Sequence, residues 1–206
     1  RDGTAVAVSD GSFKDKFGTA AWVIEGRRSD GRLEGQCIIP GGPEDQSAYR
    51  SELGGLYAIA AMVQVICELH NIQEGSIEVA CDGMNALAQV GEADPIIRPN
   101  GAQYDIIAAT QAKIKWTNIQ WKMRHVMGHQ DDTQGCTVMD CWETLNCMMD
   151  ERAKQHWQHH STRTTRVQAA VDGEPWAVWT GSSKICGRLA AQVIEHVRGT
   201  QCKVYW

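Results

Sequence analysis

The chain has 206 residues, a hydrophobic content of 43% and a formal net charge of −5. This size fits one medium-sized domain with an appendage, while the apolar stretches fall far short of the roughly 20 residues that cross a bilayer, so we expect no membrane association. The acidic balance excludes a protein that holds nucleic acid through electrostatics alone, because such proteins are usually basic.

The first part of the chain is predicted to form three strands, at residues 3–12, 17–26 and 32–42. The first strand runs into a turn at Asp10-Gly11-Ser12, since Gly and Ser are typical of turns. A polar turn at 27–32 joins the second and third strands into a hairpin. From Ser47 to about His70, apolar residues recur at helical spacing, with Ser47 as the N-cap.

The middle of the chain alternates helices and strands. Its predicted elements are a strand at 76–82, a short helix at 83–90, a loop at 91–101, a helix at about 102–115, a strand at 118–126, a polar loop at 127–136 and a helix at 145–160. Strands in a meander followed by helix-linked strands imply a mixed sheet with helices on its faces. We therefore expect an α/β fold.

Residues 161–206 differ in composition from the part before them. They are polar and then rich in Trp, and residues 183–199 have a helical period with Ser182 or Ser183 as a candidate cap. We therefore expect a main domain at 1–160 and a C-terminal extension at 161–206, which packs on that domain or on a neighbouring one.

Acidic residues stand near the ends of several predicted elements. Asp10 ends the first strand, Asp82 closes the fourth, and Glu52 and Asp150 lie in early turns of two helices. If the first and fourth strands are parallel neighbours, their two carboxylates emerge at one edge of the sheet, where ligand sites of α/β proteins tend to form. Any one of these acids, taken alone, is more simply a helix cap or a solvated surface group.

Five short motifs resemble those of one enzyme family, the type 1 ribonucleases H, including those fused to reverse transcriptases. The matching segments, in chain order, are VSDGS, YRSELGGLYAI, EVACDGMNAL, HVMGHQDD and LNCMMDERAK. Each motif alone is weak, but together they follow the family's order and cover about residues 4–156. The resemblance implies a ribonuclease H-like fold: a five-stranded mixed sheet, with three antiparallel strands and then parallel strands, and helices on both faces.

The resemblance also implies the chemistry of the acids. Two divalent metal ions, Mg²⁺ with Mn²⁺ able to substitute, would bind Asp10, Glu52, Asp82 and Asp150 in an endoribonuclease that hydrolyses the RNA strand of an RNA–DNA hybrid. Asp10 would bridge both ions, Glu52 and Asp82 would complete one site, and Asp150 would hold the second ion. His129, on a loop after a Gly, would serve proton transfer or product release, for which an unperturbed histidine pKa of about 6.5 is suitable.

Recognition of the RNA strand is expected to depend on its 2′-hydroxyl groups, which distinguish RNA from DNA across the minor groove. Backbone groups near Gly11 and Ser12 and the side chains of Asn85 and Asn146 are candidates for these contacts. They complete the set of site residues that the motifs suggest.

Two departures from the family affect substrate binding. Met127 stands where related sequences often carry Lys, and the connection between Val90 and Ala102 is short and acidic. The isolated domain is therefore expected to bind the hybrid weakly and to depend on an attached polymerase. The HVMGHQDD segment and the C-terminal segment look like the end of a retroelement reverse-transcriptase polyprotein, so a fused or adjacent reverse transcriptase is the expected partner.

Two other interpretations stay open. One is a nuclease of the same fold, such as a proofreading exonuclease or an integrase, although the former usually opens with Asp-x-Glu and the latter lacks the Arg-x-Glu-Leu helix at this point. The other is a catalytically inactive ribonuclease H-like domain that connects parts of a retroelement protein. Cleavage of a labelled hybrid, compared with an Asp10→Asn variant, separates activity from a structural role.

The eight cysteines include no Cys-x-x-Cys pair, and several lie in apolar runs, as Cys67 and Cys81 do. Buried free thiols in a reducing compartment are the simplest interpretation, which predicts an intracellular protein, in the nucleus or the cytoplasm. A structural zinc at Cys136, Cys141 and Cys147 with neighbouring histidines is an alternative, but the spacing matches no common zinc pattern.

Overall fold

The computed structural model describes residues 4–26, 31–91, 101–128, 139–162, 171–172, 177–180 and 183–204. A five-stranded sheet with the strand order β3-β2-β1-β4-β5 forms its centre. The strands are β1 (Thr4–Lys14), β2 (Phe17–Gly26), β3 (Arg32–Ile38), β4 (Ser76–Cys81) and β5 (Gln120–His125). The pairs β1–β2 and β2–β3 are antiparallel, while β4 is parallel to both β1 and β5. The predicted mixed sheet is confirmed.

The first strand is longer than the sequence suggests. β1 continues through Asp10, Gly11 and Ser12, which pair with residues 19–21 of β2, so the turn predicted at these three residues is wrong. The chain reverses instead at Asp15 and Lys16, whose φ angles are 52° and 58°. Positive φ at both residues of a two-residue loop matches the twist of the flanking strands. Pairing along the hairpin thus overrides the local turn signal.

The position of Asp10 is set by the different lengths of its two neighbouring strands. On one side β2 pairs with β1 along its whole length, but on the other side β4 pairs with β1 only as far as Val8. Asp10 therefore lies inside a strand and also just beyond the end of the parallel pairing. Asp10 is thus placed beside the carboxyl end of β4, where ligand sites of α/β sheets tend to form.

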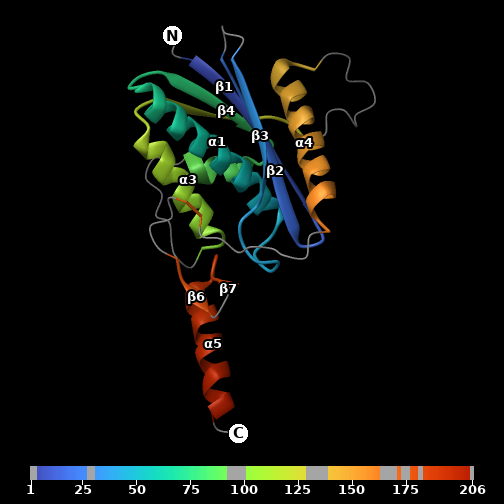
Figure 1. The fold of residues 1–206 in the computed structure, drawn as a ribbon, viewed down its shortest axis with the longest axis vertical. Helices are drawn as coiled ribbons and strands as arrows, with labels where there is room; N and C mark the ends of the chain where they lie inside the picture. The colour runs from blue at the N-terminus through green and yellow to red at the C-terminus, as the bar shows by residue number, and fades with distance from the viewer. Residues whose placement is uncertain are drawn as a thin grey trace.

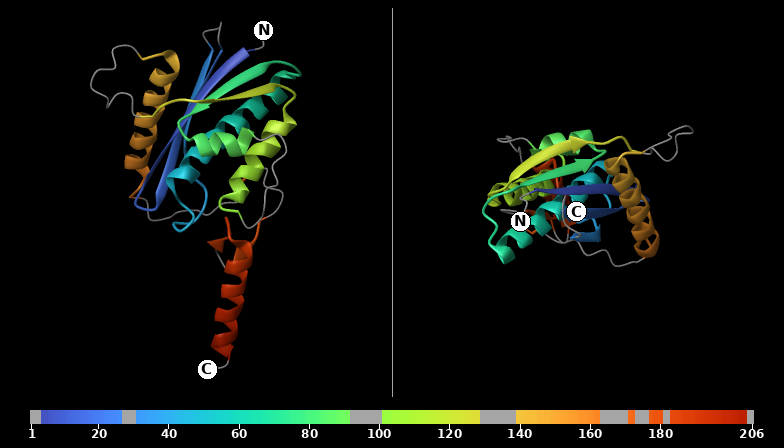
Figure 2. Two further views of the ribbon diagram at one scale, coloured as in Figure 1. Left: turned by 180° about the vertical axis from the view of Figure 1, so that it is seen from behind. Right: turned by 90° about the horizontal axis from the view of Figure 1, so that it is seen from above.

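Four helices cover the two faces of the sheet: α1 (Ala48–His70), α2 (Met84–Gly91), α3 (Tyr104–Trp116) and α4 (Cys141–His160). Figures 1 and 2 show α1 and α3 on one face and α4 on the other. Side chains of a strand alternate between faces, and accordingly Ala7 joins the core beneath α1 to α3 while Val8 joins the core beneath α4. The prediction of helices on both faces is confirmed.

The long helix α1 begins where the sequence predicts. The Ser47 hydroxyl accepts a hydrogen bond from the Arg50 backbone N–H at 3.0 Å, which caps the helix. By length and composition alone, α1 could cross a membrane, contrary to the expectation that every apolar stretch is too short. Leu53 and Ile59 are nevertheless fully buried in the core against the sheet, as in the core helix of a globular domain.

The helix α4 begins four residues earlier than predicted. Asp140 and Glu143 form a capping box: the Asp140 carboxylate accepts from the Glu143 backbone N–H at 2.8 Å, and the Glu143 carboxylate accepts from the Asp140 backbone N–H at 2.9 Å. Asp150 consequently lies in the middle of α4 rather than in an early turn. A residue in mid-helix is held more firmly than one in a fraying first turn.

The described part of the C-terminal extension contains three elements, β6 (Trp179–Thr180), β7 (Ser183–Lys184) and α5 (Leu189–Val204). The helix predicted over 183–199 starts only at Leu189, because Ser183 and Lys184 pair with β6 instead. In Figure 1, α5 projects away from the sheet, and the C-terminus lies at the opposite end of the molecule from the N-terminus.

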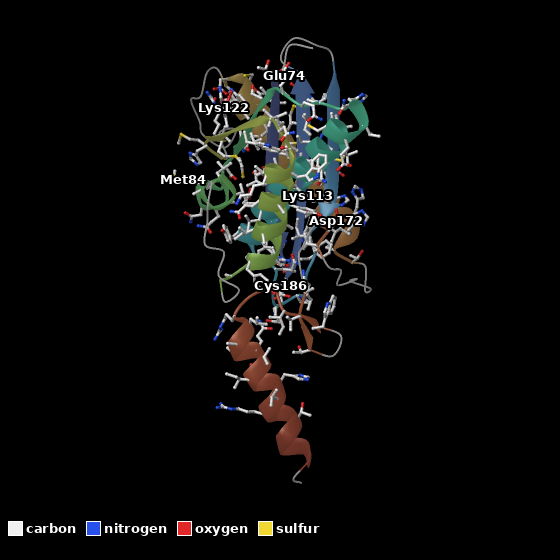
Figure 3. The ribbon with its side chains drawn as sticks, turned by 90° about the vertical axis from the view of Figure 1, so that its left-hand side faces the viewer. Glu74, Met84, Lys113, Lys122, Asp172 and Cys186 are labelled. Atoms are coloured by element: carbon white, nitrogen blue, oxygen red, sulfur yellow. The ribbon has the colours of Figure 1, made fainter. Side chains whose placement is uncertain are left out.

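Two sets of contacts join the extension to the helices of the main domain. In the first, the Tyr57 hydroxyl donates to the Asp172 carbonyl at 2.9 Å, and Lys113 Nζ lies 2.8 Å from Asp172 Oδ2 (Figure 3). The second set involves Lys184, Ile185 and Cys186, which are almost completely buried. The extension therefore contributes side chains to the interior of the molecule.

The second set of contacts is centred on a buried carboxylate. Both oxygens of Asp105, on α3, accept hydrogen bonds from the Arg50 guanidinium at 2.9 and 2.8 Å, and Lys184 Nζ lies 2.9 Å from Asp105 Oδ2. All three side chains are inaccessible to solvent. Burial alone would raise the pKa of Asp105, but Arg50 and Lys184 outweigh it and lower this pKa to about 2. One ionised carboxylate thus joins α1, α3 and β7.

Candidate active site

Four acidic residues from four elements meet at one edge of the sheet. Asp10 comes from β1, Glu52 from the second turn of α1, Asp82 from the position directly after β4, and Asp150 from α4. Asp10 is 4% exposed and lies within electrostatic reach of the other three carboxylates. The acids to which the sequence motifs point therefore lie together.

Asp10 is the centre of this acidic cluster. Burial, followed by the negative charges of Glu52, Asp82 and Asp150, raises the pKa of Asp10 far above its ordinary value. A side-chain hydrogen bond between Asp10 and Asp82 also favours the protonated form. Carboxyl groups crowded in this way hold a proton, or a cation that takes the place of the proton.

Glu52 reaches the cluster because α1 passes very close to β1. A Cβ atom at Gly11 would lie 2.6 Å from the Ser51 carbonyl carbon and 2.7 Å from the Glu52 nitrogen, so only Gly fits there. The Gly11 backbone N–H donates to the Glu52 carboxylate, and the Cys81 thiol donates to Glu52 Oε2 at 3.1 Å. Burial, followed by the charge of Asp82, raises the pKa of Glu52.

Asp82 is surrounded by the chain that leaves β5. The His125 ring nitrogen Nε2 lies 3.0 Å from the Asp82 carbonyl oxygen. A Cβ atom at Gly128 would lie 2.5 Å from Asp82 Oδ2, so any larger residue there would displace the Asp82 carboxylate. The chain just before His129 is therefore adjacent to the acidic cluster, although His129 itself lies outside the described residues.

Asp150 is partly exposed and pairs with a lysine of its own helix. Its Oδ2 is 2.6 Å from Lys154 Nζ, one turn further along α4. Asn146, one turn earlier on the same helix, is only 2% exposed, and its side-chain oxygen has no hydrogen-bond partner in the described part of the chain. The face of α4 that points to the sheet thus presents an amide and a carboxylate in successive turns.

The four residues suggested for RNA contacts are in different surroundings. Gly11 uses its backbone N–H for Glu52, and the Ser12 carbonyl accepts from the Ser51 hydroxyl at 3.2 Å. Asn85 is exposed on α2, whereas Asn146 is buried. The exposed Asn85 side chain is therefore the one most accessible to a bound nucleic acid.

Three residues beside the acidic cluster escaped the sequence reasoning. In the sequence, Cys81 stands out only as a thiol in an apolar run, Lys154 only as part of a motif, and His125 only as a histidine near the cysteines of the zinc alternative. Strand alternation and helix periodicity give the side of an element on which a residue lies, but not which partner from another element it meets. The sequence did contain one indication that Cys81 lies beside the acids, namely its position directly before Asp82.

The donor atoms of the cluster fit a hard divalent cation. Glu52, Cys81 and Asp82 offer ligand atoms within 4.8 Å of one another, and Asp10 is hydrogen-bonded to Asp82. Carboxylate oxygens are the ligands that Mg²⁺ prefers, and four acids crowded around the buried Asp10 supply more negative charge than they can hold without a cation or protons. Burial, followed by the charge of Glu52, raises the pKa of the Cys81 thiol, so this sulfur stays protonated and acts as a hydrogen-bond donor.

Comparison with solved structures identifies the fold, while no protein-family model and no curated protein matches the sequence. LC11 ribonuclease H1, in complex with an RNA/DNA hybrid, is 12% identical with a TM-score of 0.53, and the match covers 73% of this chain and 94% of that one. The structure of the same ribonuclease, isolated from compost, gives 12% identity and a TM-score of 0.50 over 75% and 98% of the two chains. Similarity at this level shows a common architecture, and the observed sheet order and helix placement agree with it. The chain therefore has a ribonuclease H-like fold.

Proposed function

We propose that this protein is an endoribonuclease that hydrolyses the RNA strand of an RNA–DNA hybrid in a reaction that depends on two divalent metal ions. The observation that carries the proposal is the convergence of Asp10, Glu52, Asp82 and Asp150 from β1, α1, β4 and α4. The ribonuclease of the same fold that was solved in complex with an RNA/DNA hybrid supports this class of substrate.

The four acids would hold the ions, Mg²⁺ or Mn²⁺, in the following way. Asp10 is the natural shared ligand because it lies within reach of all three other carboxylates. Glu52 and Asp82, whose ligand atoms lie within 4.8 Å of each other, would form one side of the site, and Asp150 the other. Bound there, the two ions supply positive charge to the attacking and leaving oxygens of the phosphodiester.

The residues around the acids have supporting roles in this proposal. Gly11 and Gly128 allow α1 and the chain after β5 to approach the acids closely. His129, which follows Gly128, moves a proton or assists product release. Gly11, Ser12, Asn85 and Asn146 contact the RNA strand, and the buried Asn146 acts from within the site.

We further propose that the protein works inside the cell next to a reverse-transcriptase domain, as part of a retroelement polyprotein. The net charge of −5 supports dependence on an attached polymerase, since an acidic domain gains little affinity from the phosphates of a hybrid. Addition of a reverse transcriptase in trans, or fusion to one, should then lower the hybrid concentration needed for cleavage.

The test is cleavage of an end-labelled RNA–DNA hybrid in Mg²⁺ or Mn²⁺, beside RNA–RNA and DNA–DNA duplexes. We expect internal cuts in the RNA strand of the hybrid alone, and no cleavage in a chelator. Asp10→Asn should reduce the rate at least about 100-fold, because it removes a ligand from charge stabilisation worth several kcal/mol.

Glu44→Gln is the matched control, because it makes the same acid-to-amide change at an exposed side chain that pairs with Lys16. Its cleavage rate should equal that of the unchanged protein. A folded chain that cleaves no hybrid under any of these conditions would instead support a structural, connecting domain. Cleavage of DNA would indicate an exonuclease or integrase of the same fold.

A further inference from the structure

Cys81 stands at the point where the strand β4 meets the acidic cluster. It is the last residue of β4, it is 0% exposed, and it belongs to the core between the sheet and α1. Its sulfur lies 3.1 Å from Glu52 Oε2 and 4.0 Å from Asp82 Oδ1. A residue that is buried only for packing does not need to touch two carboxylates.

The hydrogen bonds around this sulfur form a chain with a fixed direction. The Gly83 backbone N–H donates to Cys81 Sγ at 3.3 Å, and Cys81 in turn donates to Glu52. Gly83 belongs to the turn that carries Asp82 from β4 into α2, and a Cβ atom there would lie 3.0 Å from Glu52 Cγ. The thiol thereby connects the turn that holds Asp82 with the side chain of Glu52 on another element.

Glu52 needs such a connection because its side chain is long and enters the cluster from a helix. A glutamate loses rotamer freedom when it is held in one geometry, and hydrogen bonds to fixed donors offset this loss. In the described residues the Cys81 thiol donates to this carboxylate, and the Gly11 backbone N–H lies near enough to lower its pKa. The first comes from β4 and the second from β1, so Glu52 is held between the two strands that carry Asp82 and Asp10.

We propose that Cys81 is a positioning residue whose thiol holds the Glu52 carboxylate beside Asp82 in the geometry that a divalent ion requires. The proposal rests on the function proposed above, and it assigns a role in that reaction to a residue that contacts neither substrate nor product. A loss of the thiol should weaken ion binding and lower kcat, while KM for the hybrid stays unchanged.

The experiment compares Cys81→Ser, Cys81→Ala and Cys81→Val. Serine keeps a donor, alanine removes it and leaves a small void, and valine removes it while filling the space. Cys67→Ala and Cys67→Val are the matched controls, because Cys67 is a buried free thiol in the same core, on α1, and within the described residues no hydrogen bond joins its side chain to the four acids. Melting curves establish that each variant is folded.

Binding of Mn²⁺ to the protein without nucleic acid, measured by calorimetry, is the first readout, and kcat and KM for a labelled hybrid are the second. For Cys81→Ala and Cys81→Val we expect about tenfold weaker Mn²⁺ binding and a similar fall in kcat, the size of one hydrogen bond to a charged group. Cys81→Ser should recover most of both, and the Cys67 variants should match the unchanged protein. If Cys81→Val does not fold, Cys81→Ala provides the comparison.

The outcomes separate this proposal from the proposed function. Normal Mn²⁺ affinity and kcat in folded Cys81→Ala and Cys81→Val would overturn the role of Cys81 without contradicting the proposed ribonuclease activity. Mn²⁺ binding that depends on the donor at position 81, in a protein that cleaves no hybrid, would support the role of Cys81 and contradict the proposed activity. Equal losses in the Cys81 and Cys67 variants would show that packing alone is responsible.

Discussion

Two glycines determine how closely the backbone approaches the acidic carboxylates. At Gly11 an added Cβ atom would meet the backbone of Ser51 and Glu52, and at Gly128 it would meet the Asp82 carboxylate. The motifs that contain these glycines also contain or adjoin acids that the structure brings together. They could not predict that the glycines leave room for neighbouring atoms rather than form turns. Those neighbouring atoms belong to elements distant in the sequence.

Gly11→Ala tests this point. The new methyl group would push the start of α1 away from β1, which we expect to cost about 1–3 kcal/mol of stability through overpacking. A displacement of Glu52 by about 1 Å would in addition lower hybrid cleavage about 100-fold. Denaturant unfolding and the cleavage assay measure the two effects separately.

Gly199→Ala provides the control for this substitution. Gly199 lies in α5, and no atom of the described residues lies within 4 Å of an added Cβ atom, so the methyl group is tolerated and favours the helix by up to about 1 kcal/mol. Full activity in Gly11→Ala would mean that α1 and β1 separate easily without moving Glu52.

At the level of elements, the sequence predicted the sheet and its helices well but misplaced several boundaries. Gly11 and Ser12 resemble a turn, yet they pair within β1 because β2 offers partners along its whole length. The helix α4 was predicted too short because its capping box begins at Asp140, before the first strongly periodic residues. Boundaries of this kind are decided by pairing and capping partners, which local periodicity does not contain.

The hairpin that joins β1 to β2 provides a prediction at this level. Lys16 has a φ of 58°, a conformation that costs a residue with a side chain about 1–2 kcal/mol but costs glycine little. Lys16→Gly should therefore raise the free energy of unfolding by up to about 1 kcal/mol, even though it removes the exposed ion pair with Glu44.

Lys14→Gly is the control, and chemical denaturation measures the free energy of unfolding of both variants. Lys14 is the last residue of β1, so glycine there loses strand preference and should lower stability. A destabilised Lys16→Gly protein, with Lys14→Gly unaffected, would contradict the left-handed loop and restore the turn predicted at Gly11 and Ser12.

At the level of the whole molecule, the extension is connected to the main domain through buried charge. The composition of residues 161–206 suggested an appended segment, and the sequence could not show that Lys184 reaches Asp105, which is 79 positions away. Pairings between distant charged residues leave no local pattern in a single sequence. The extension therefore has to be judged by its contacts rather than by its composition.

Asp105→Asn should be the most damaging change in this connection. It leaves the buried Arg50 and Lys184 side chains without their shared carboxylate, which we expect to cost about 3–5 kcal/mol. Lys184→Met should cost less, because Asp105 keeps both hydrogen bonds from Arg50. Glu44→Gln, in an exposed ion pair, should change the free energy of unfolding by less than about 1 kcal/mol. Losses of equal size in Asp105→Asn and Glu44→Gln would contradict the buried position of this group.

The acidic cluster makes the stability of the whole molecule depend on pH and on divalent ions. Burial and mutual repulsion raise the pKa values of Asp10 and Glu52 in the folded protein above the ordinary carboxyl value of about 4. The folded state then binds more protons than the unfolded state, so the free energy of unfolding falls as the pH rises above about 4, by up to about 1.4 kcal/mol per pH unit for each proton. Melting temperatures in a chelator should accordingly decrease from about pH 5 to about pH 8.

Mg²⁺ should reverse this dependence, because it binds the ionised carboxylates and stabilises only the folded state. The rise in melting temperature on adding Mg²⁺ should therefore be larger at about pH 8 than at about pH 5, where protons compete with the ion for Asp10 and Glu52. Asp10→Asn should flatten the pH dependence in the chelator and reduce the effect of Mg²⁺, whereas Glu44→Gln should leave both unchanged. If Asp10→Asn keeps the full pH dependence, other titrating groups such as histidines cause it, and the mutual repulsion of the four acids is too weak to make them a cation site.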